Sequence, residues 1–385
     1  MKVGRFHLTY CSNIHPGETW QQVSAALTDA LPRVRALLGV EGPLAIGLRL
    51  SAQAAEALAS GDALARFRDF LRDGDYYVPT INGFPYGAFH GERVKERVYL
   101  PDWRDPARVE YTNRLATILA ELLSDRPDVD GSVSTAPGAF RAHVRTADDV
   151  KGIADGIRRH AAHLRRIHES TGRTIVLAIE PEPACYLETV DDVLPFFGEH
   201  LAAADIRRYV GVCFDSCHMA VEYEPPVEAL RRLEQAGIRI GKFQISSALR
   251  VEAGRRDALV PALGRFADDT YLHQVVERSP DGFTRYTDLP EALDARRGAG
   301  STAGGEWRVH YHVPIFLGTL GDLETTQPDL VALLDALRTA PPSDRSPCLE
   351  VETYTWDVLP PEHRTVDVCT AIARELTWVR RRLEP

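Results

Sequence analysis

Short apolar runs recur along the chain, and most are followed by a longer segment with apolar residues at helical spacing. The run at residues 175–179 is apolar throughout and stops at Glu180 and Pro181, which suits a strand buried on both faces. Pro79 is awkward in a central strand, so the third run is the least regular of the set. Eight runs have strand character: residues 5–10, 44–50, 76–82, 130–135, 175–179, 209–215, 238–244 and 348–352.

The segments between these runs have the apolar periodicity of amphipathic helices. They cover residues 20–38, 51–71, 106–123, 147–171, 190–201 and 227–236, with a last one at 365–383. Strands that alternate with helices predict βα units and a parallel sheet.

The spacing of strand ends predicts that the sheet closes into a (β/α)8 TIM barrel. Glu180 and Asp215 are 35 positions apart, and Asp215 and Gln244 are 29 apart. One unit of an eightfold barrel of about 250 residues is roughly 31 residues long. Gln244 and Glu352 are 108 positions apart, which is far too long for one unit. We therefore expect a single domain, residues 1–385, with a long insertion at 250–345 between strands 7 and 8.

Oxygen-bearing side chains occur at the ends of the last four strands. Glu180, Asp215, Gln244 and Glu352 follow strands five to eight, and the C-terminal mouth of a TIM barrel carries its functional site. Three neighbouring carboxylates repel one another without a cation, so the set predicts a divalent metal ion, namely Mn²⁺, Mg²⁺, Co²⁺ or Zn²⁺. Taken singly, each acid could instead be a strand-end cap or an ion-pair partner.

Three histidines are further candidates for the site. In Asp215-Ser-Cys-His218 the histidine follows the acid at the same mouth, where it could ligate the metal, hold a substrate hydroxyl or cap the next helix. His310 and His312 alternate, so an extended segment places both on one face. They could bind metal or substrate, or hydrogen-bond within the core.

Other polar residues near strand ends are candidates for catalysis or for lining a substrate pocket. Glu350 shares a face with Glu352, one layer deeper. Lys242 shares a face with Gln244 and could act as an acid or an anion anchor, and Glu182 lies just above Glu180. The remaining substrate-pocket candidates are His7, Asn13, Arg49, Asn82 and His90.

Composition narrows the class of protein. The net charge is −10 without a cluster of Lys and Arg, which argues against a nucleic-acid surface. No apolar run approaches the ~18 residues of a membrane span. The six cysteines are scattered and no signal peptide is visible, so we expect reduced thiols in a cytoplasmic protein.

The strand-end residues resemble those of the xylose-isomerase-like TIM barrels, a superfamily of sugar isomerases, epimerases and type-IV endonucleases. Glu180, Asp215 and Glu352 match that superfamily's metal ligands. The Asp215-Ser-Cys-His218 stretch is similar to the Asp-x-x-His element of keto-sugar epimerases, whose histidine contacts substrate. Gln244 departs from the pattern, because the superfamily usually has a histidine there. The resemblance leaves open whether Gln244 or His312 completes the site.

The whole chain is more closely similar to the EboE family of the ebo gene clusters. The stretches that carry this resemblance are Leu8-Thr-Tyr-Cys-Ser-Asn-Ile-His-Pro-Gly-Glu18, Gly47-Leu-Arg-Leu-Ser-Ala52, Thr80-Ile-Asn-Gly-Phe-Pro-Tyr-Gly87, Tyr99-Leu-Pro-Asp-Trp103, Arg308-Val-His-Tyr-His-Val-Pro314 and Leu349-Glu-Val-Glu-Thr-Tyr-Thr-Trp356. The family's name is "metabolite traffic protein", and its clusters encode a cyclitol-synthase-like protein and a UbiA-like prenyltransferase. The resemblance implies a sugar-like or cyclitol metabolite and other ebo-cluster proteins as partners, and it leaves open whether the protein forms a homo-oligomer.

Three functions follow from these patterns. The first is a metal-dependent isomerase or epimerase in which Glu180 and Glu352 shuttle a proton and His218 orients a substrate oxygen. The second is a phosphodiester-cleaving nuclease, which should have more histidine ligands and a basic groove. The third is a metabolite carrier without turnover, which the weak ligand Gln244 favours.

Overall fold

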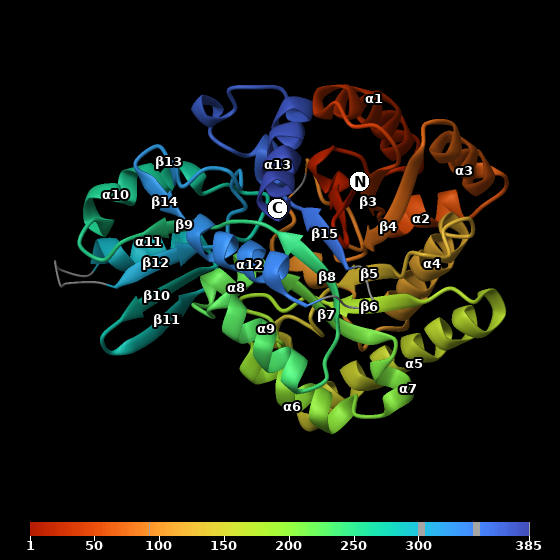
Figure 1. The fold of residues 1–385 in the computed structure, drawn as a ribbon. Helices are drawn as coiled ribbons and strands as arrows, with labels where there is room; N and C mark the ends of the chain where they lie inside the picture. The colour runs from red at the N-terminus through yellow and green to blue at the C-terminus, as the bar shows by residue number, and fades with distance from the viewer. Residues whose placement is uncertain (92, 299–304, 342–346, 385) are drawn as a thin grey trace.

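The larger of the two sheets in the described part of the chain forms a barrel. The computed structural model describes residues 1–91, 93–298, 305–341 and 347–384. The strand order is β1-β2-β15-β8-β7-β6-β5-β4-β3, and every neighbouring pair is parallel except β1 with β2. A parallel bridge between Cys11 and Gly47 brings β2 and β3 together and all but completes the circle (Figure 1). The strands are β1 (Lys2–Val3), β2 (Phe6–Tyr10), β3 (Leu44–Arg49), β4 (Tyr76–Asn82), β5 (Gly131–Thr135), β6 (Ile175–Ile179), β7 (Val210–Asp215), β8 (Ile240–Ile245) and β15 (Cys348–Val351).

This arrangement confirms the predicted TIM barrel and all eight of its strands. Pro79 is accommodated because the register between β3 and β4 shifts where Ala45 pairs with Tyr77 and Gly47 pairs with Thr80. The proline falls in this irregularity, where the ladder does not need its missing N–H.

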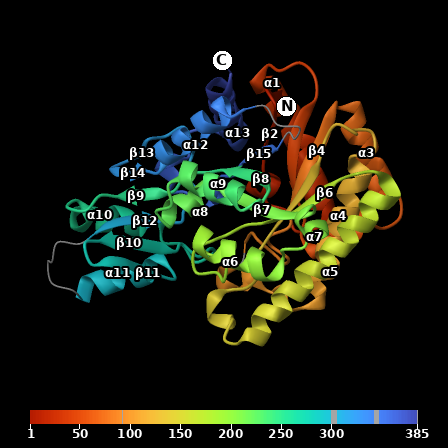
Figure 2. The same cartoon turned by 60° about the horizontal axis from the view of Figure 1, so that its bottom comes forward.

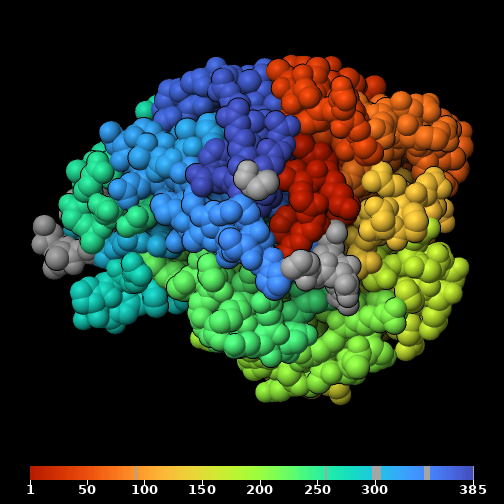
Figure 3. All heavy atoms as spheres, in the orientation of Figure 1, coloured from red at the N-terminus to blue at the C-terminus, as the bar shows by residue number. Residues whose placement is uncertain are grey.

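Helices surround the barrel, and the first and last of them pack on each other (Figures 1 and 2). Their bounds are α1 (Trp20–Leu38), α2 (Ala52–Leu58), α3 (Ala63–Asp73), α4 (Pro106–Leu122), α5 (Ala147–Thr171), α6 (Val190–His200), α7 (Ala204–Arg207), α8 (Ser216–Val221), α9 (Pro226–Gln235), α12 (Gln327–Thr339) and α13 (Val368–Leu383). In Figure 3 the N-terminal segment in red adjoins the C-terminal segment in blue, as closure of a barrel requires.

Two helix predictions differ from the structure by more than one residue at an end. The segment at 51–71 forms two helices, because the chain turns at Gly61 in the left-handed region with φ +59°. Ser51 does cap the first of them, accepting a hydrogen bond from the Ala54 N–H. The last helix begins at Val368, not at 365, because the Asp367 side chain caps it.

The insertion follows β8 and contains the second, antiparallel sheet, with the order β11-β10-β12-β9-β14-β13. It lies to one side of the barrel in Figures 1 and 2. Its elements are β9 (Leu249–Val251), α10 (Arg256–Leu263), β10 (Val275–Ser279), β11 (Gly282–Tyr286), α11 (Leu289–Gly298), β12 (Glu306–Val309), β13 (Thr319–Leu320) and β14 (Leu323–Thr325). Of the predicted insertion 250–345, residues 299–304 and 342–345 lie outside the described ranges. After the insertion, α12 is again part of the layer of helices around the barrel, where it packs against α9 and α13.

Among the described residues, six short 3₁₀ helices lie in the connections: η1 (Ser12–Ile14), η2 (Lys95–Tyr99), η3 (Arg141–His143), η4 (Gly264–Phe266), η5 (Tyr354–Asp357) and η6 (Pro361–His363). All six cysteines are buried and free. Each helix of the described residues is too short or too polar to cross a membrane.

Glu375 of α13 ties the end of β15 to the insertion. Its Oε1 accepts hydrogen bonds from the Thr353 hydroxyl at 2.7 Å and from the Ile315 N–H at 3.2 Å. Burial raises the pKa of this carboxyl to about 7 from an ordinary value of 4.5. The folded state is therefore favoured at low pH, and this advantage is lost as the pH rises through about 7.

A Glu375→Gln variant is expected to be more stable than the wild type above neutral pH. Glutamine keeps the accepting oxygen and removes the buried charge. The difference in free energy of unfolding should grow by about 2 kcal/mol between about pH 5.5 and about pH 8. Urea unfolding at several pH values measures it, and a variant that is less stable at pH 8 would contradict this account of the carboxyl.

Candidate active site

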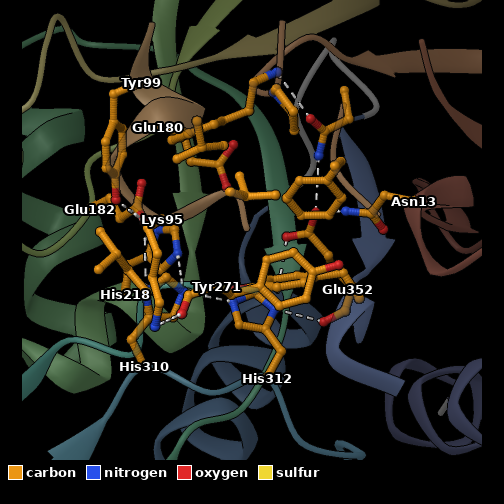
Figure 4. A pocket seen from close by; sticks show the side chains of 18 residues that line it. Asn13, Lys95, Tyr99, Glu180, Glu182, His218, Tyr271, His310, His312 and Glu352 are labelled. Carbon is orange, nitrogen blue, oxygen red and sulfur yellow. Dashed lines mark hydrogen bonds and ion pairs between the residues drawn. The ribbon is translucent and has the colours of Figure 1, made fainter. Parts of the chain in front are cut away.

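A pocket opens where the barrel strands end, between the barrel and the insertion. Its side chains come from the ends of β4, β6 and β15, from the helix after β7, and from the segment after β12 (Figure 4). The labelled residues in that view are Asn13, Lys95, Tyr99, Glu180, Glu182, His218, Tyr271, His310, His312 and Glu352.

Three carboxylates meet at the base of this region, and we call Glu180, Asp215 and Glu352 the carboxylate cluster. Each offers one oxygen, and these oxygens lie within 4.8 Å of one another. All three residues are buried. Glu180 follows the apolar strand β6 and is held there by Pro181, which ends the strand. The structure thus brings together three acids that the sequence spreads over 173 positions.

The electrostatics of the cluster favour a bound cation. Burial, with Glu352 and Asp215 nearby, raises the pKa of Glu180 well above its ordinary value. Burial and Asp215 raise the pKa of Glu352 to about 8. Burial alone would raise the pKa of Asp215 too, but His218, His312 and hydrogen bonds outweigh it, so this pKa is lowered. Oε2 of Glu180 and Oδ2 of Asp215 are buried without a hydrogen-bond partner. Buried oxygens of this kind are costly unless something binds them.

Glu352 is oriented by two amides. Its Oε1 accepts hydrogen bonds from Nδ2 of Asn13 at 2.7 Å and Nδ2 of Asn82 at 2.9 Å. The sequence places both asparagines near strand ends, and the structure adds what holds Asn13: its carbonyl oxygen accepts from Nε2 of His90 at 2.7 Å. Oε2 of Glu352 is left free of these amides, 3.8 Å from Nδ1 of His312.

Gln244 lies in register with the cluster, because it pairs with Asp215 across β7 and β8. It is buried, and both atoms of its side-chain amide lack a hydrogen-bond partner. An amide oxygen is a ligand that hard cations accept. The donor set at these strand ends therefore fits a divalent cation held by oxygen atoms.

The three predicted histidines also come together, and we call His218, His310 and His312 the histidine cluster. Nε2 of His310 lies 3.1 Å from Nε2 of His218 and 3.3 Å from Nε2 of His312. Burial, with the neighbouring histidines, lowers the pKa of His310 well below its ordinary value, and burial lowers the pKa of His312 to about 4. The imidazoles of His310 and His312 are thus neutral near pH 7.

Glu182 lines the pocket and is held by Tyr99 and Gln274, two residues that are not among the predicted site residues. Its Oε1 accepts from the Tyr99 hydroxyl at 2.9 Å and from Nε2 of Gln274 at 3.4 Å. Tyr99 belongs to a stretch that the sequence comparison had already singled out, whereas nothing in the sequence marks Gln274. The segment that follows β4, residues 83–91 and 93–99, lines the pocket, and we call it the covering loop. Lys95 of this loop, also outside the predicted set, donates to Asp288 and to two carbonyls and so anchors the covering loop to the insertion.

The structure places the other predicted residues outside the pocket, each with partners of its own. His7 lies against the Tyr77 hydroxyl, at 2.9 Å. Arg49 donates to Glu18 and to the carbonyls of Gly17 and Gly87.

Lys242 and Glu350 form an ion pair inside the barrel, with Nζ 2.6 Å from Oε1 and both side chains fully buried. Their space exists because position 47 is glycine: a Cβ there would come within 1.5 Å of Oε2 of Glu350. Neither side chain lines the pocket, so neither is placed to contact a substrate bound there.

Comparison with known proteins identifies the fold. A family model described as "Xylose isomerase-like TIM barrel" matches residues 55–294. No curated protein matches the chain.

Solved structures of similar fold include a xylose isomerase-like TIM barrel protein from Mycobacterium smegmatis in complex with magnesium. It has a TM-score of 0.53 and 12% identity, covering 100% of this chain and 98% of that one. An L-ribulose 3-epimerase has a TM-score of 0.51 and 14% identity over 98% of this chain and 94% of its own. A D-psicose 3-epimerase, solved in the presence of D-fructose, has a TM-score of 0.50 and 15% identity over 99% and 100%. At these identities the similarity concerns the fold.

Proposed function

The chain belongs to the xylose isomerase-like TIM barrel family, and from its carboxylate cluster we propose that it is a metal-dependent isomerase or epimerase of a sugar-like or cyclitol metabolite. The observation that carries the proposal is the group of three buried carboxylates within 4.8 Å, two of which have an oxygen without a partner. Two proteins of similar fold are named as ketose 3-epimerases, and another is in complex with magnesium. The names of these proteins support a sugar-like substrate and a bound divalent metal ion.

The carboxylate cluster would hold the cation, with Gln244 as its fourth protein ligand. Mg²⁺, Mn²⁺ or Co²⁺ suits this oxygen-rich set. When bound, such an ion supplies Lewis acidity toward the oxygens of a carbonyl compound.

The chain's own residues would move the proton. Oε2 of Glu352 is the atom that would take a proton from the carbon beside the carbonyl, since Asn13 and Asn82 occupy Oε1. Glu180, with its unpartnered Oε2, would return a proton. His218 is held by its Nδ1 and would direct Nε2 at a substrate oxygen. The covering loop and the insertion would exclude water from the reacting carbons.

Exchange of substrate protons with solvent tests this function. The purified protein, stripped of metal and then supplied with Mn²⁺, should incorporate deuterium from D₂O into the carbon beside the carbonyl of a ketose. D-Fructose and L-ribulose serve as the first probes, with an inosose as a cyclitol probe, and NMR reads the exchange. Exchange should stop when EDTA removes the metal. Metal binding without exchange on any probe would contradict the catalytic proposal.

A carrier without turnover is the second candidate, as the similarity to the EboE family implies. Gln244 favours it, because an amide is a weaker ligand than the histidine usual at this position in the superfamily. In that case the probes would bind and raise the melting temperature without exchanging protons. As a carrier, the protein would exchange its metabolite with other proteins encoded in the ebo gene clusters.

A further inference from the structure

Another cavity, of about 310 Å³, lies against the insertion and shares no lining residue with the pocket of the candidate active site. We call it the side cavity. Its lining comes from the connections after β5 and β6, from the residue that caps the end of α8, and from β10 and β11, and it includes Arg141, Ala184, Glu188, Glu222, Gln274 and Arg285. The volume is in the range of small-molecule sites.

Gln274 separates the side cavity from the active-site pocket. Its Nε2 donates to the Tyr99 hydroxyl at 3.0 Å and to the Pro183 carbonyl oxygen at 3.0 Å. Its Oε1 lies 2.7 Å from Nδ1 of His310. Both ends of this amide are thus held by the active-site side, and a molecule in the side cavity would be one side chain away from the histidine cluster.

Glu222 lines the side cavity with an oxygen that lacks a partner. Its side chain is fully buried, and Oε2 accepts hydrogen bonds from Nε of Arg285 at 3.1 Å and from Nη2 at 2.5 Å. Oε1 is also buried, and no described residue donates to it. Burial, with Glu188 nearby, raises the pKa of Glu222 to about 7. A buried carboxylate oxygen of this kind is costly unless a donor binds it.

The other charged residues of the side cavity leave donors at its rim. Both oxygens of Glu188 are used, since Oε1 accepts from the Ala184 N–H at 2.7 Å and Oε2 accepts from Nη2 of Arg141 at 3.1 Å. The side chains of Arg141 and Arg285 are 46% and 42% exposed. A guanidinium has five N–H donors, so both arginines keep donors for an anionic group.

The backbone of the side cavity is strained at Ala184. This residue has φ +67°, in the left-handed region that favours glycine. The Arg141 N–H donates to its carbonyl oxygen at 2.9 Å, and its own N–H donates to Glu188. Strain of this kind persists where the surroundings enforce it, and it concentrates at ligand-binding sites.

We propose that the side cavity binds a small zwitterion, whose ammonium group donates to Oε1 of Glu222 and whose carboxylate accepts from Arg141 at the rim. An ammonium forms a charge-assisted hydrogen bond with an unpartnered carboxylate oxygen, and a guanidinium has the geometry to bind a carboxylate. A neutral sugar would leave both charged ends without a counterpart. This site goes beyond the proposed function and requires neither the metal ion nor the substrate.

Calorimetry of the whole protein with ω-amino acids of increasing length tests the proposal. Glycine, γ-aminobutyrate and ε-aminocaproate hold their two charges at increasing separations. The length that fits should bind at one site per chain and raise the melting temperature. The alkylamine and the fatty acid of the same length should each bind more than about tenfold more weakly, because each makes one charged pair instead of two.

Variants locate the bound probe. Glu222→Gln should weaken binding roughly ten- to a hundredfold, the worth of one hydrogen bond between charged groups, while its amide oxygen can still accept from Arg285. Glu224→Gln is the matched control, because burial also raises the pKa of this carboxyl to about 7, but it accepts from the Val190 N–H and does not line the side cavity. It should bind the probe as tightly as the wild type. Circular dichroism checks that each variant is folded.

An ammonium could instead pair with the carboxylate cluster, and Glu352→Gln distinguishes the two sites. This variant should bind the probe as the wild type does. Loss of binding in Glu352→Gln but not in Glu222→Gln would overturn the inference, and so would the absence of binding of all three amino acids at millimolar concentration. Binding of the amine alone as tightly as the zwitterion would also overturn it. None of these results bears on the proposed function, because the measurement involves neither Mn²⁺ nor solvent exchange.

Discussion

Glu352→Gln is expected to reduce solvent exchange of a substrate proton by about a hundred- to ten-thousandfold, the usual worth of a general base. Glutamine has the same shape, and its oxygen can still accept from Asn13 and Asn82. What it lacks is an ionisable Oε2 that can accept a proton or bind the cation. We also expect its Mn²⁺ affinity to fall, because one of three carboxylate ligands is gone. NMR exchange in D₂O and Mn²⁺ titration by calorimetry measure the two effects.

Glu375→Gln is the matched control for this variant. It makes the same change at a buried glutamate next to the site, whose Oε1 has protein partners. Exchange and Mn²⁺ affinity should stay within about twofold of the wild type. If Glu352→Gln behaved like this control, Glu352 would have no part in the chemistry.

Lys242→Met is expected to destabilise the protein by about 3–5 kcal/mol, because it leaves Glu350 as an unpaired buried charge. Burial alone would lower the pKa of Lys242, but Glu350, with Cys213, Cys11 and Glu180 nearby, raises it well above its ordinary value, so the lysine is charged. Its Nζ also donates to the Ser134 hydroxyl at 3.1 Å. Urea unfolding followed by circular dichroism measures the loss.

The double variant Lys242→Met/Glu350→Gln tests the cause. With both charges removed, most of the lost stability should return, because the penalty comes from the single unpaired carboxylate. If the double variant were as unstable as Lys242→Met, the loss would instead arise from packing around the methionine. A catalytic Lys242 would be indicated if the double variant were stable but lost solvent exchange.

The sequence predicts the barrel well because its strands are buried on both faces. Five apolar residues before Glu180 and a proline after it mark the end of β6 without any tertiary information. Apolar runs also lead to Asp215 and Glu352, and parallel strand ends meet at one mouth. The carboxylate cluster thus follows from topology alone.

The insertion could not be predicted in the same way. The strand β11 (Gly282–Tyr286) is mostly exposed, so its polar and apolar residues carry no clear period. Its partner is set by long-range pairing with β10. The sequence shows that something is inserted but not that it forms a six-stranded sheet.

The sequence did not predict which side chains in and around the site contact each other. Lys242 lies on β8 and Glu350 on β15, which are neighbours in the sheet. The two residues are 108 positions apart in the chain, so sequence spacing could not predict their ion pair. Gln274 is one of many polar residues in the insertion, and its contact with His310 depends on how the second sheet docks. The outcome is that residues predicted to touch substrate, such as Arg49, lie in structural networks.

The metal site at the carboxylate cluster is tested most directly by soaking a crystal of the protein in Mn²⁺ and measuring anomalous scattering. A strong peak is expected between Glu180, Asp215 and Glu352, within about 2.0–2.6 Å of one oxygen from each. Manganese found only on surface carboxylates, with these three side chains unmoved, would contradict it.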